Sequence, residues 1–439
     1  MCYNVRISWK RGKIMKKNTL DPNRRSRRLL IVEATVEYFI SLCVTSTFLT
    51  AILNEMDVSA SLQGIISAIT SLACSVQLFA VFGVKRTYPC KRWVSILNLV
   101  NQLLFAVLYC VPMIDVSKEI KIAVFIGMLL AAYVCQHYLT PSRTSWQMSL
   151  VEDNCRGIFS AKKEIVSLIS GMIFSQVAGI LLDYYKAKDD MQACFIIFCI
   201  TVTVLSLLHL AIMLMTKEPK PETVAPSKTF GEILHVVFDN SDLRRVIVFD
   251  TLFGIANVSL YFYSVYLTQT MGFSYTYITA VAIAHAIFRS VVSPFLGRMA
   301  DKRSWATMLR LCMIVLAVGY VFFTVATPKT AIFLYPVFSL CYAFSLGGSN
   351  AGRTNLCLDY VNHEDRRYIL GIKDAICGVL SFVATLGASA LVSHVEGNGN
   401  TFFGIAVYPQ QILFAISALM MLALAFFFLP KFKKPTRLM

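Results

Sequence analysis

The chain has 439 residues, of which 56% are hydrophobic and 15% charged, and its mean hydropathy is +0.63. Soluble globular proteins are about 45–50% apolar and about 25% charged, so this composition excludes an ordinary cytosolic enzyme, a disordered chain and a collagen-like repeat. The apolar residues form long runs with few charges, which is typical of helices that cross a bilayer. The sequence therefore predicts a polytopic membrane protein.

Apolar stretches of about 20 residues, each long enough to cross a ~30 Å hydrocarbon core as a helix, recur along the whole chain. We expect the first six at residues 29–54, 61–83, 93–113, 122–143, 164–185 and 193–215. The second six are expected at 246–270, 276–296, 306–326, 331–350, 371–394 and 409–430. The strands of a membrane barrel would be ~10-residue alternating segments. The sequence thus predicts an all-α protein with twelve transmembrane helices.

Polar segments divide these helices into two bundles. A basic tail at 1–28 precedes the first six-helix bundle at 29–215, and a polar linker at 216–243 leads to the second bundle at 244–430. A short tail at 431–439 ends the chain.

Lysine and arginine are strongly biased toward one side of the predicted helices. Of the 41 such residues, all but six fall in the tails, the linker and the loops on that side, and this count places Arg143 and Arg353 in loops. The exceptions are Lys118, Lys121, Lys186, Lys188 and Lys329, together with Arg289 inside a predicted helix. Cytoplasmic loops carry such an excess. Both termini are therefore predicted to be cytoplasmic, in a plasma-membrane protein, and the basic charge requires no nucleic-acid partner.

The 13 cysteines are scattered, and no two form a C-x-x-C pair. Most lie inside apolar runs, where a free cysteine acts as a small apolar residue. We expect neither a disulfide framework nor a metal site, and nothing in the sequence calls for a cofactor.

The two halves repeat each other in three places, in the same order and with nearly the same shift. Each match alone is weak, but together they indicate two copies of one unit in the same orientation, as in transporters built from parallel repeats. The matched segments are Arg27-Arg28 with Glu33 and Arg244-Arg245 with Asp250; Met56–Ser59 and Met271–Ser274; and Arg143-Thr144 with Lys163 and Glu164 and Arg353-Thr354 with Lys373 and Asp374.

Two loop segments resemble a known family. The stretch from Gly297 through Asp301, Lys302 and Arg303 to Trp305 is similar to a loop signature of the major facilitator superfamily, and Trp146–Gly157 resembles a loop of its prokaryotic members. The resemblance covers about residues 29–430. It implies a monomeric secondary transporter for a small-molecule substrate, with two bundles rocking around a site at the middle of the membrane.

The resemblance also implies a gate in the loop at residues 297–303. In the family the loop carboxylate binds the start of a helix in the other half, which here implies Asp301 against the start of the fifth helix. A carboxylate at a helix N-terminus gains roughly 0.3–1 kcal/mol, a small energy that suits a contact broken in each cycle. The matching loop of the first half, Lys85–Arg92, has no acidic residue, so a symmetric gate is not expected.

Charged side chains inside the first helix are candidates for function. Glu33 and Glu37 are four residues apart and share a helix face. A charge at the middle of a membrane helix costs about 2.5–3.5 kcal/mol on insertion scales. Glu33 lies about 7 Å beyond Arg28 by helical rise and can reach the interface or pair with an arginine, whereas Glu37 lies about 13 Å in.

On the eighth helix, His285 and Arg289 are also four residues apart, and Arg289 lies near the middle of the membrane. An arginine there needs a carboxylate, an anionic substrate or water, and Glu37 is the natural partner. Asp250 heads the repeated seventh helix and is the reserve carboxylate. Gln136 and His137 are further polar residues, on the fourth helix. A single histidine in a membrane helix, such as His137 or His209, is more often a hydrogen-bonded packing residue than a functional one.

These observations predict a secondary transporter without enzymatic activity. Its transport is predicted to be coupled to protons through Glu37, with Arg289 as the counter-charge of this carboxylate. A membrane-embedded enzyme is a less favoured alternative, because no metal or nucleophile motif is present. A non-transporting sensor on the same scaffold is another alternative. The single membrane arginine hints at an anionic or zwitterionic substrate.

Overall fold

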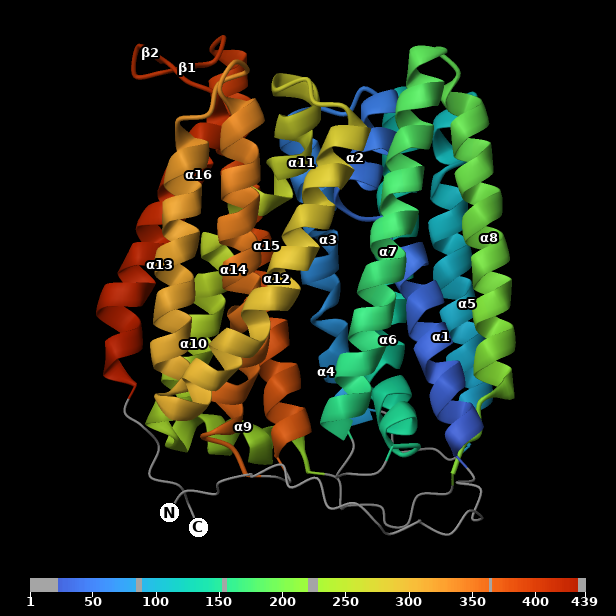
Figure 1. Cartoon of the computed structure of the whole chain (residues 1–439), viewed down its shortest axis with the longest axis vertical. Coiled ribbons are helices and arrows are strands. Elements are labelled where there is room, and N and C mark those ends of the chain that lie inside the picture. Colours follow the sequence, from blue (N-terminus) through green and yellow to red (C-terminus); the bar gives the residue numbers. More distant parts are fainter. Residues whose placement is uncertain (1–22, 84–88, 152–155, 220–227, 363–364, 433–439) are drawn as a thin grey trace, which may run out of the picture.

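The computed structural model describes residues 23–83, 89–151, 156–219, 228–362 and 365–432. It is a bundle of long helices with one two-stranded hairpin (Figure 1). The helices of the first half are α1 (Arg24–Cys43), α2 (Ser46–Glu55), α3 (Ala60–Ala73), α4 (Val76–Gly83), α5 (Lys91–Leu108), η1 (Val111–Met113), α6 (Lys118–Met148), α7 (Arg156–Ala187) and α8 (Met191–Met215).

The second half begins with a short helix and repeats the same kind of arrangement. Its elements are α9 (Phe230–Asp239), α10 (Ser241–Ala256), η3 (Val258–Tyr261), α11 (Tyr263–Val265), η4 (Tyr266–Thr270), α12 (Tyr275–Lys302), α13 (Trp305–Thr324), α14 (Ala331–Leu358), α15 (Arg366–Gly397), β1 (Thr401–Phe402), β2 (Ile405–Ala406), α16 (Pro409–Ala423), η5 (Leu424–Phe428) and η6 (Leu429–Lys431). The strands β1 and β2 pair antiparallel.

Within the described residues, 10 helices are long and apolar enough to cross a membrane. They fall on ten of the twelve predicted stretches. The other two stretches correspond to α5, whose first turn contains Lys91 and Arg92, and to the series of short helices α10–η3–α11–η4. The all-α membrane fold is confirmed, and the count of twelve stays a prediction.

Several helices run well past their predicted ends. The stretch expected at 122–143 is α6, which continues to Met148, and the stretch expected at 164–185 is α7, which begins at Arg156. Hydropathy marks only the segment that lies in hydrocarbon, whereas the helix itself continues into the polar region. This difference moves Arg143 from a predicted loop into a helix.

Two of the membrane helices are interrupted near their middle. The first predicted helix is α1 followed by α2, with a break at Val44 and Thr45 and a positive φ of 48° at Ser46. The second is α3 followed by α4, with a break at Cys74 and Ser75. Such breaks place backbone and short polar side chains at the depth where transporter cavities form.

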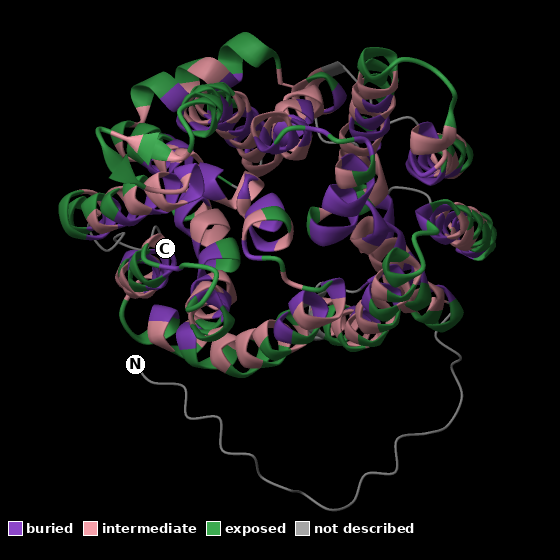
Figure 2. Ribbon diagram, turned by 90° about the horizontal axis from the view of Figure 1, so that it is seen from above, coloured by how far each residue is buried: buried purple, intermediate pink, exposed green. Residues whose placement is uncertain are grey.

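The buried core separates into one large cluster in each half. The first cluster contains residues between Val36 and Ile212, joined by Tyr275, and the second contains residues between Ile233 and Leu429. Buried residues lie inside each bundle, whereas exposed ones lie along the outside (Figure 2). The outward faces carry exposed apolar side chains such as Ile169, Ile173 and Val177 on α7, as expected of surfaces that face lipid.

The linker contains a helix that the sequence did not indicate. The helix α9 begins with a capping box, in which Thr229 and Glu232 each bond the other's backbone N–H. Its first residue, Phe230, packs edge-on against Phe82 of α4, with ring centroids 5.3 Å apart. Within the segment predicted as the linker, α9 therefore packs on the second half, where it buries Ile233 and Val237.

The halves meet in the middle of the molecule where α15 crosses α3. A Cβ atom on Gly378 of α15 would lie 2.2 Å from the backbone oxygen of Ser71 in α3. Only a residue without a side chain permits so close an approach. The packing of one half on the other therefore depends on this glycine.

We call the end of the molecule where α1 begins the tail end and the opposite end, where α2 lies, the far end (Figure 1). Polar contacts join the halves at the far end. Asn54 of α2 accepts a hydrogen bond of 2.7 Å from Gln269. Asp183 near the end of α7 accepts hydrogen bonds of 2.9 and 2.7 Å from the backbone N–H groups of Tyr275 and Thr276. The far end is thus closed by contacts between the halves.

Candidate functional site

A buried ion cluster lies inside the first half, between α1, α6 and α8. Glu33 of α1 is 1% exposed, and its Oε1 lies 2.9 Å from Nη2 of Arg143 on α6. The same oxygen accepts a hydrogen bond of 3.0 Å from Gln147 and contacts Nε2 of His209 at 3.1 Å. A buried carboxylate needs such partners, because an unpaired charge in a low-dielectric interior is costly.

Glu37 is the second carboxylate of this cluster. Both of its oxygens accept hydrogen bonds from the two terminal nitrogens of Arg143, in the bidentate geometry that guanidinium groups favour. Its side chain is 30% exposed, against 1% for Glu33. Arg143 therefore bridges one fully buried carboxylate and one that reaches open space.

His209 of α8 lies between Glu33 and two amide side chains of α5. The amide nitrogens of Asn98 and Gln102 on α5 both lie 2.8 Å from Nδ1 of this fully buried ring. Because amide nitrogens are donors, Nδ1 acts as the acceptor and the ring proton lies on Nε2, which donates to Glu33.

A small cavity of about 170 Å³ opens beside Glu37. Gln136 and His137 of α6 line it. Nδ1 of His137 lies 3.0 Å from the side-chain nitrogen of Gln77 on α4. The buried Oε1 of Gln136 has no hydrogen-bond partner within the described residues, so it is available to a water molecule or a proton carrier in this cavity.

The second half contains a related ion cluster. Asp250 of α10 is buried, with Oδ2 accepting a hydrogen bond of 2.8 Å from Lys373 and Oδ1 lying 2.9 Å from Nε of Arg353. Lys373 also contacts Asp374 at 2.8 Å. The guanidinium of Arg353 lies over the ring of Phe253, 4.4 Å from its centroid.

The two clusters occupy the positions that the sequence repeat matched. Glu33 corresponds to Asp250, and Arg143 corresponds to Arg353. They differ in how the ions pair, because in the first cluster Arg143 contacts both carboxylates, whereas in the second Asp250 contacts both Arg353 and Lys373.

Arg289 does not contact Glu37, so the pairing expected from the sequence was wrong. Its Nη2 lies 3.6 Å from Oε1 of Glu164 on α7, in the other half. Its side chain is 25% exposed, and it sits on a part of α12 that faces the other half. His285, one turn away, has its Nδ1 3.0 Å from the backbone oxygen of Ser339 and fits a packing role.

Three residues of the first cluster satisfy the spacing of a metal site. One ligand atom each from Glu33, Glu37 and His209 lie within 4.8 Å of one another. The guanidinium of Arg143 contacts both carboxylates and supplies the positive charge that a cation would bring. The arrangement is that of an ion-pair network.

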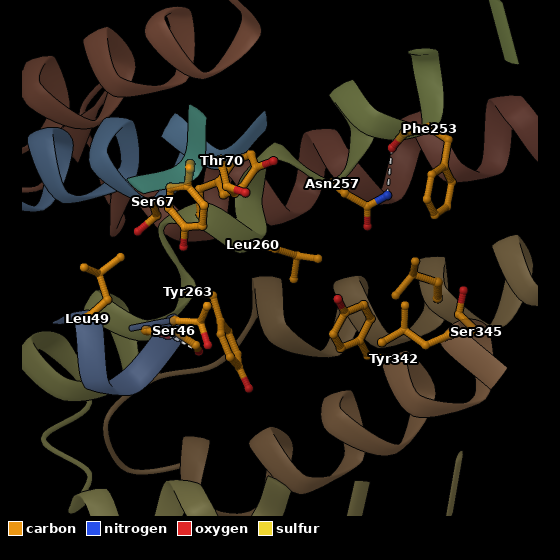
Figure 3. A pocket seen from close by; sticks show the side chains of 16 residues that line it. Ser46, Leu49, Ser67, Thr70, Phe253, Asn257, Leu260, Tyr263, Tyr342 and Ser345 are labelled. Carbon is orange, nitrogen blue, oxygen red and sulfur yellow. Dashed lines mark hydrogen bonds between the residues drawn. The ribbon is translucent and has the colours of Figure 1, made fainter. Parts of the chain in front are cut away.

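A larger cavity of about 430 Å³ lies between the halves, where α2, α3 and α6 meet the interrupted helix α10–η3–α11 and α14. Figure 3 shows Ser46, Ser67 and Thr70 on one side and Asn257, Tyr342 and Ser345 on the other, all around the same space. Thr45, Thr70 and Tyr133 line both this central cavity and the small cavity beside Glu37. The ion cluster and the central cavity are therefore neighbours.

A family model agrees with this architecture. The model of the Major Facilitator Superfamily matches residues 34–385. The chain belongs to this superfamily. A search of curated protein sequences found no match.

Solved structures of the superfamily's fold match nearly the whole chain. The nucleoside transporter NupG is 13% identical, with 93% of this chain and 100% of that chain covered and a TM-score of 0.66. A D-xylose-proton symporter is 14% identical, with 94% and 98% covered and a TM-score of 0.69. A bacterial homologue of the human lysosomal transporter Spinster, in an inward-facing and unoccupied conformation, is 12% identical, with 94% and 97% covered and a TM-score of 0.60.

Membership in the superfamily makes the chain a multi-pass membrane protein of a transporter family, as the sequence analysis predicted. The gate predicted from the superfamily's loop is not formed among the described residues. Asp301 is exposed at the end of α12 and makes no ion pair with another described residue, and space is open around Gly297. Lys302 and Arg303 are exposed as well. The first side chains of α7, which Asp301 would meet, lie outside the described part.

Sequence reasoning missed Arg143 and His209 as members of the site. Arg143 was counted among loop cations, although the repeat already matched it to Arg353. Because a matched arginine and a matched carboxylate occur in both halves, the pair Glu33–Arg143 and the pair Asp250–Arg353 could have been proposed from the repeat alone. Nothing local to His209 marked it, since its neighbours along α8 are apolar.

Proposed function

We propose that this protein is a secondary active transporter that moves a small molecule across the plasma membrane by alternating access, with both termini cytoplasmic, and that protons drive it. The observation that carries the proposal is the first ion cluster, in which Glu33 and Glu37 share Arg143. The far-end contacts include hydrogen bonds between the halves, such as those of Asp183 and Asn54, which can break and re-form in each cycle.

Glu37 is the proton carrier in this proposal, and Arg143 takes the place that the sequence analysis gave to Arg289. The groups that face Glu37 are Glu33 on its own helix and Arg143 and His137 on α6. While Arg143 is bound to Glu37, the carboxylate is held by two hydrogen bonds from the guanidinium. When rearrangement draws Arg143 toward Glu33 alone, the freed carboxylate in a low-dielectric site favours protonation.

The partial exposure of Glu37 supports this division of roles. Glu33 is fully enclosed by Arg143, His209 and Gln147, so it keeps its charge and anchors the arginine. Glu37 borders a cavity that shares residues with the central one. A proton on Glu37 therefore changes the charge next to the space where a substrate would sit.

The test is Glu37→Gln in proteoliposomes, with a substrate first found by a thermal-shift screen, since a ligand that binds the folded state raises its apparent stability. We expect the variant to lose accumulation driven by an imposed pH gradient and to keep exchange of substrate without a gradient. Glu119→Gln, a fully exposed carboxylate at the start of α6, is the control and should behave as the unmodified protein.

Normal accumulation by the Gln variant would show that Glu37 is structural. If the protein binds a ligand and moves none, the scaffold is a sensor and the proposed transport is wrong.

A further inference from the structure

The lining of the central cavity is uncharged throughout. Its described residues are Thr45, Ser46, Leu49, Ser67, Thr70, Tyr133, Phe253, Asn257, Leu260, Tyr261, Tyr263, Ser264, Leu316, Tyr342, Ser345 and Leu346. Hydroxyl groups and one amide alternate with aromatic rings. Ligand sites of about 300–1,000 Å³ hold a small organic molecule, and about 430 Å³ lies in that range.

One fully buried hydroxyl in this wall lacks a partner among the described residues. Ser345 of α14 is 1% exposed, and its Oγ forms no hydrogen bond with any described residue. A serine in a helix ordinarily bonds the carbonyl four residues earlier, as Ser206 of α8 does at 2.7 Å. An unsatisfied buried hydroxyl costs free energy unless a ligand or water completes it. Its position on the cavity wall (Figure 3) makes a bound ligand the natural partner.

Further donors stand around the same space. Tyr342, one turn before Ser345, forms no side-chain hydrogen bond with another described residue, and Figure 3 shows its ring bordering the cavity. The side chain of Asn257 is fixed from both ends, since its nitrogen donates to Phe253 at 2.7 Å and its oxygen accepts from Tyr320 at 2.8 Å. An amide nitrogen has a second hydrogen, which remains for a ligand.

The charges nearest to the cavity are already matched. Glu37, in the adjoining small cavity, is paired with Arg143, and Arg289 faces Glu164 at 3.6 Å. Arg353, which lies over the ring of the lining residue Phe253, is paired with Asp250. A charged substrate in the central cavity would lose its hydration without gaining a free counter-charge, which is unfavourable. The expectation of an anionic substrate came from Arg289 alone, and this arginine already has a carboxylate partner.

We propose that the substrate is an uncharged molecule that carries a ring and several hydroxyl or amide groups, bound in the central cavity by Tyr342, Ser345 and Asn257 and by stacking on the cavity's aromatic rings. The inference rests on the proposed function, because it names the substrate class of that transporter. The aromatic rings suit the flat apolar face of such a molecule, and the hydroxyl and amide groups suit its polar edge.

The experiment compares molecules of one ring type that differ in charge, with the purified full-length protein. One series is glucose, glucuronate and glucosamine, and the other is uridine and uridine monophosphate. Binding is measured by calorimetry and by thermal shift. We expect a neutral member of one series to bind and its charged relatives to bind at least about tenfold more weakly, because each would bury an unpaired charge. The two series separate a sugar-like from a nucleoside-like ligand.

Cavity variants place the binding at this site. Ser345→Ala and Tyr342→Phe should each weaken binding of the neutral ligand about 5- to 10-fold, the loss expected for one hydrogen bond. Ser206→Ala, whose hydroxyl is equally buried but bonded within its own helix, is the matched control and should leave binding unchanged.

Preferential binding of a charged member would overturn the inference, as would binding to none of the neutral molecules or an unchanged affinity in both cavity variants. The proposed proton coupling can fail separately. If a neutral ligand binds and exchanges but Glu37→Gln still accumulates it under a pH gradient, the substrate class stands and the role of Glu37 does not.

Discussion

Asp183 and Thr276 join the two halves of the molecule, since Oδ2 of Asp183 accepts a hydrogen bond of 2.7 Å from the backbone N–H of Thr276. Oδ1 of the same carboxylate accepts one of 2.9 Å from Tyr275. The carboxylate at the end of α7 thus caps the first turn of α12, where free N–H groups and the helix dipole favour negative charge. The superfamily resemblance implies a contact of this kind for Asp301 at the tail end, which stays a prediction, and the structure contains one at the far end.

Asp183→Ala should loosen the far end. The substitution removes both hydrogen bonds and leaves two N–H groups of α12 without their acceptor, at a cost of about 1 kcal/mol. In a cysteine-free background, a cysteine at Ser264, which contacts Ser46 of the other half at 2.8 Å, should label several-fold faster from the far side. Asp115→Ala, an exposed carboxylate at the same end, is the control. An unchanged labelling rate would mean that this capping contact does not hold the halves together.

The two ion clusters should respond differently to loss of their arginines. Arg143→Ala leaves the buried Glu33 without the guanidinium that pairs with it at 2.9 Å, which is expected to cost about 3–5 kcal/mol. Arg353→Ala leaves Asp250 with Lys373 at 2.8 Å, so the loss should be less than half as large. Thermal unfolding of the two purified variants measures the difference. Equal destabilisation would contradict the assigned pairings.

Gly378→Ala should disrupt the crossing of α3 and α15. The added Cβ would meet the backbone oxygen of Ser71 at 2.2 Å, and forcing extra volume into such a contact costs about 1–3 kcal/mol. Gly387→Ala on the same helix, where nothing lies within 4 Å of the new Cβ, is the matched control. The first variant should unfold at a lower temperature and the second should not. A similar unfolding temperature for both would show that the halves can separate there without penalty.

Labelling from either side of the membrane tests the orientation taken from the positive charges. In a cysteine-free background, a cysteine at Lys188, in the turn between α7 and α8, should react with an impermeant reagent from outside the cell. A cysteine at Glu232 on α9 should react only from inside. Both positions are exposed. Reaction of both from one face would overturn the predicted topology.

The membrane fold was predictable from the sequence because its cause is local. Long apolar runs must form helices in lipid, where every backbone polar group needs an internal partner, and the matched segments around Glu33 and Asp250 revealed the repeat. The same local reasoning failed at Arg143. The length of an apolar run ends α6 at the edge of the hydrocarbon, but the helix continues to Met148 and carries its arginine into the bundle.

Which cation neutralises Glu37 was decided only by the tertiary structure. Both Arg143 and Arg289 are distant from Glu37 along the chain, and hydropathy ranked Arg289 first because it lies deeper in its apolar run. Packing of α6 against α1 brings Arg143 to Glu37 and Glu33 together, whereas α12 lies against α7 and turns Arg289 toward Glu164. A sequence shows that a buried charge needs a partner, but the partner is set by which helices pack side by side, because Coulomb attraction falls with distance and each charge binds the counter-charge that folding brings within reach.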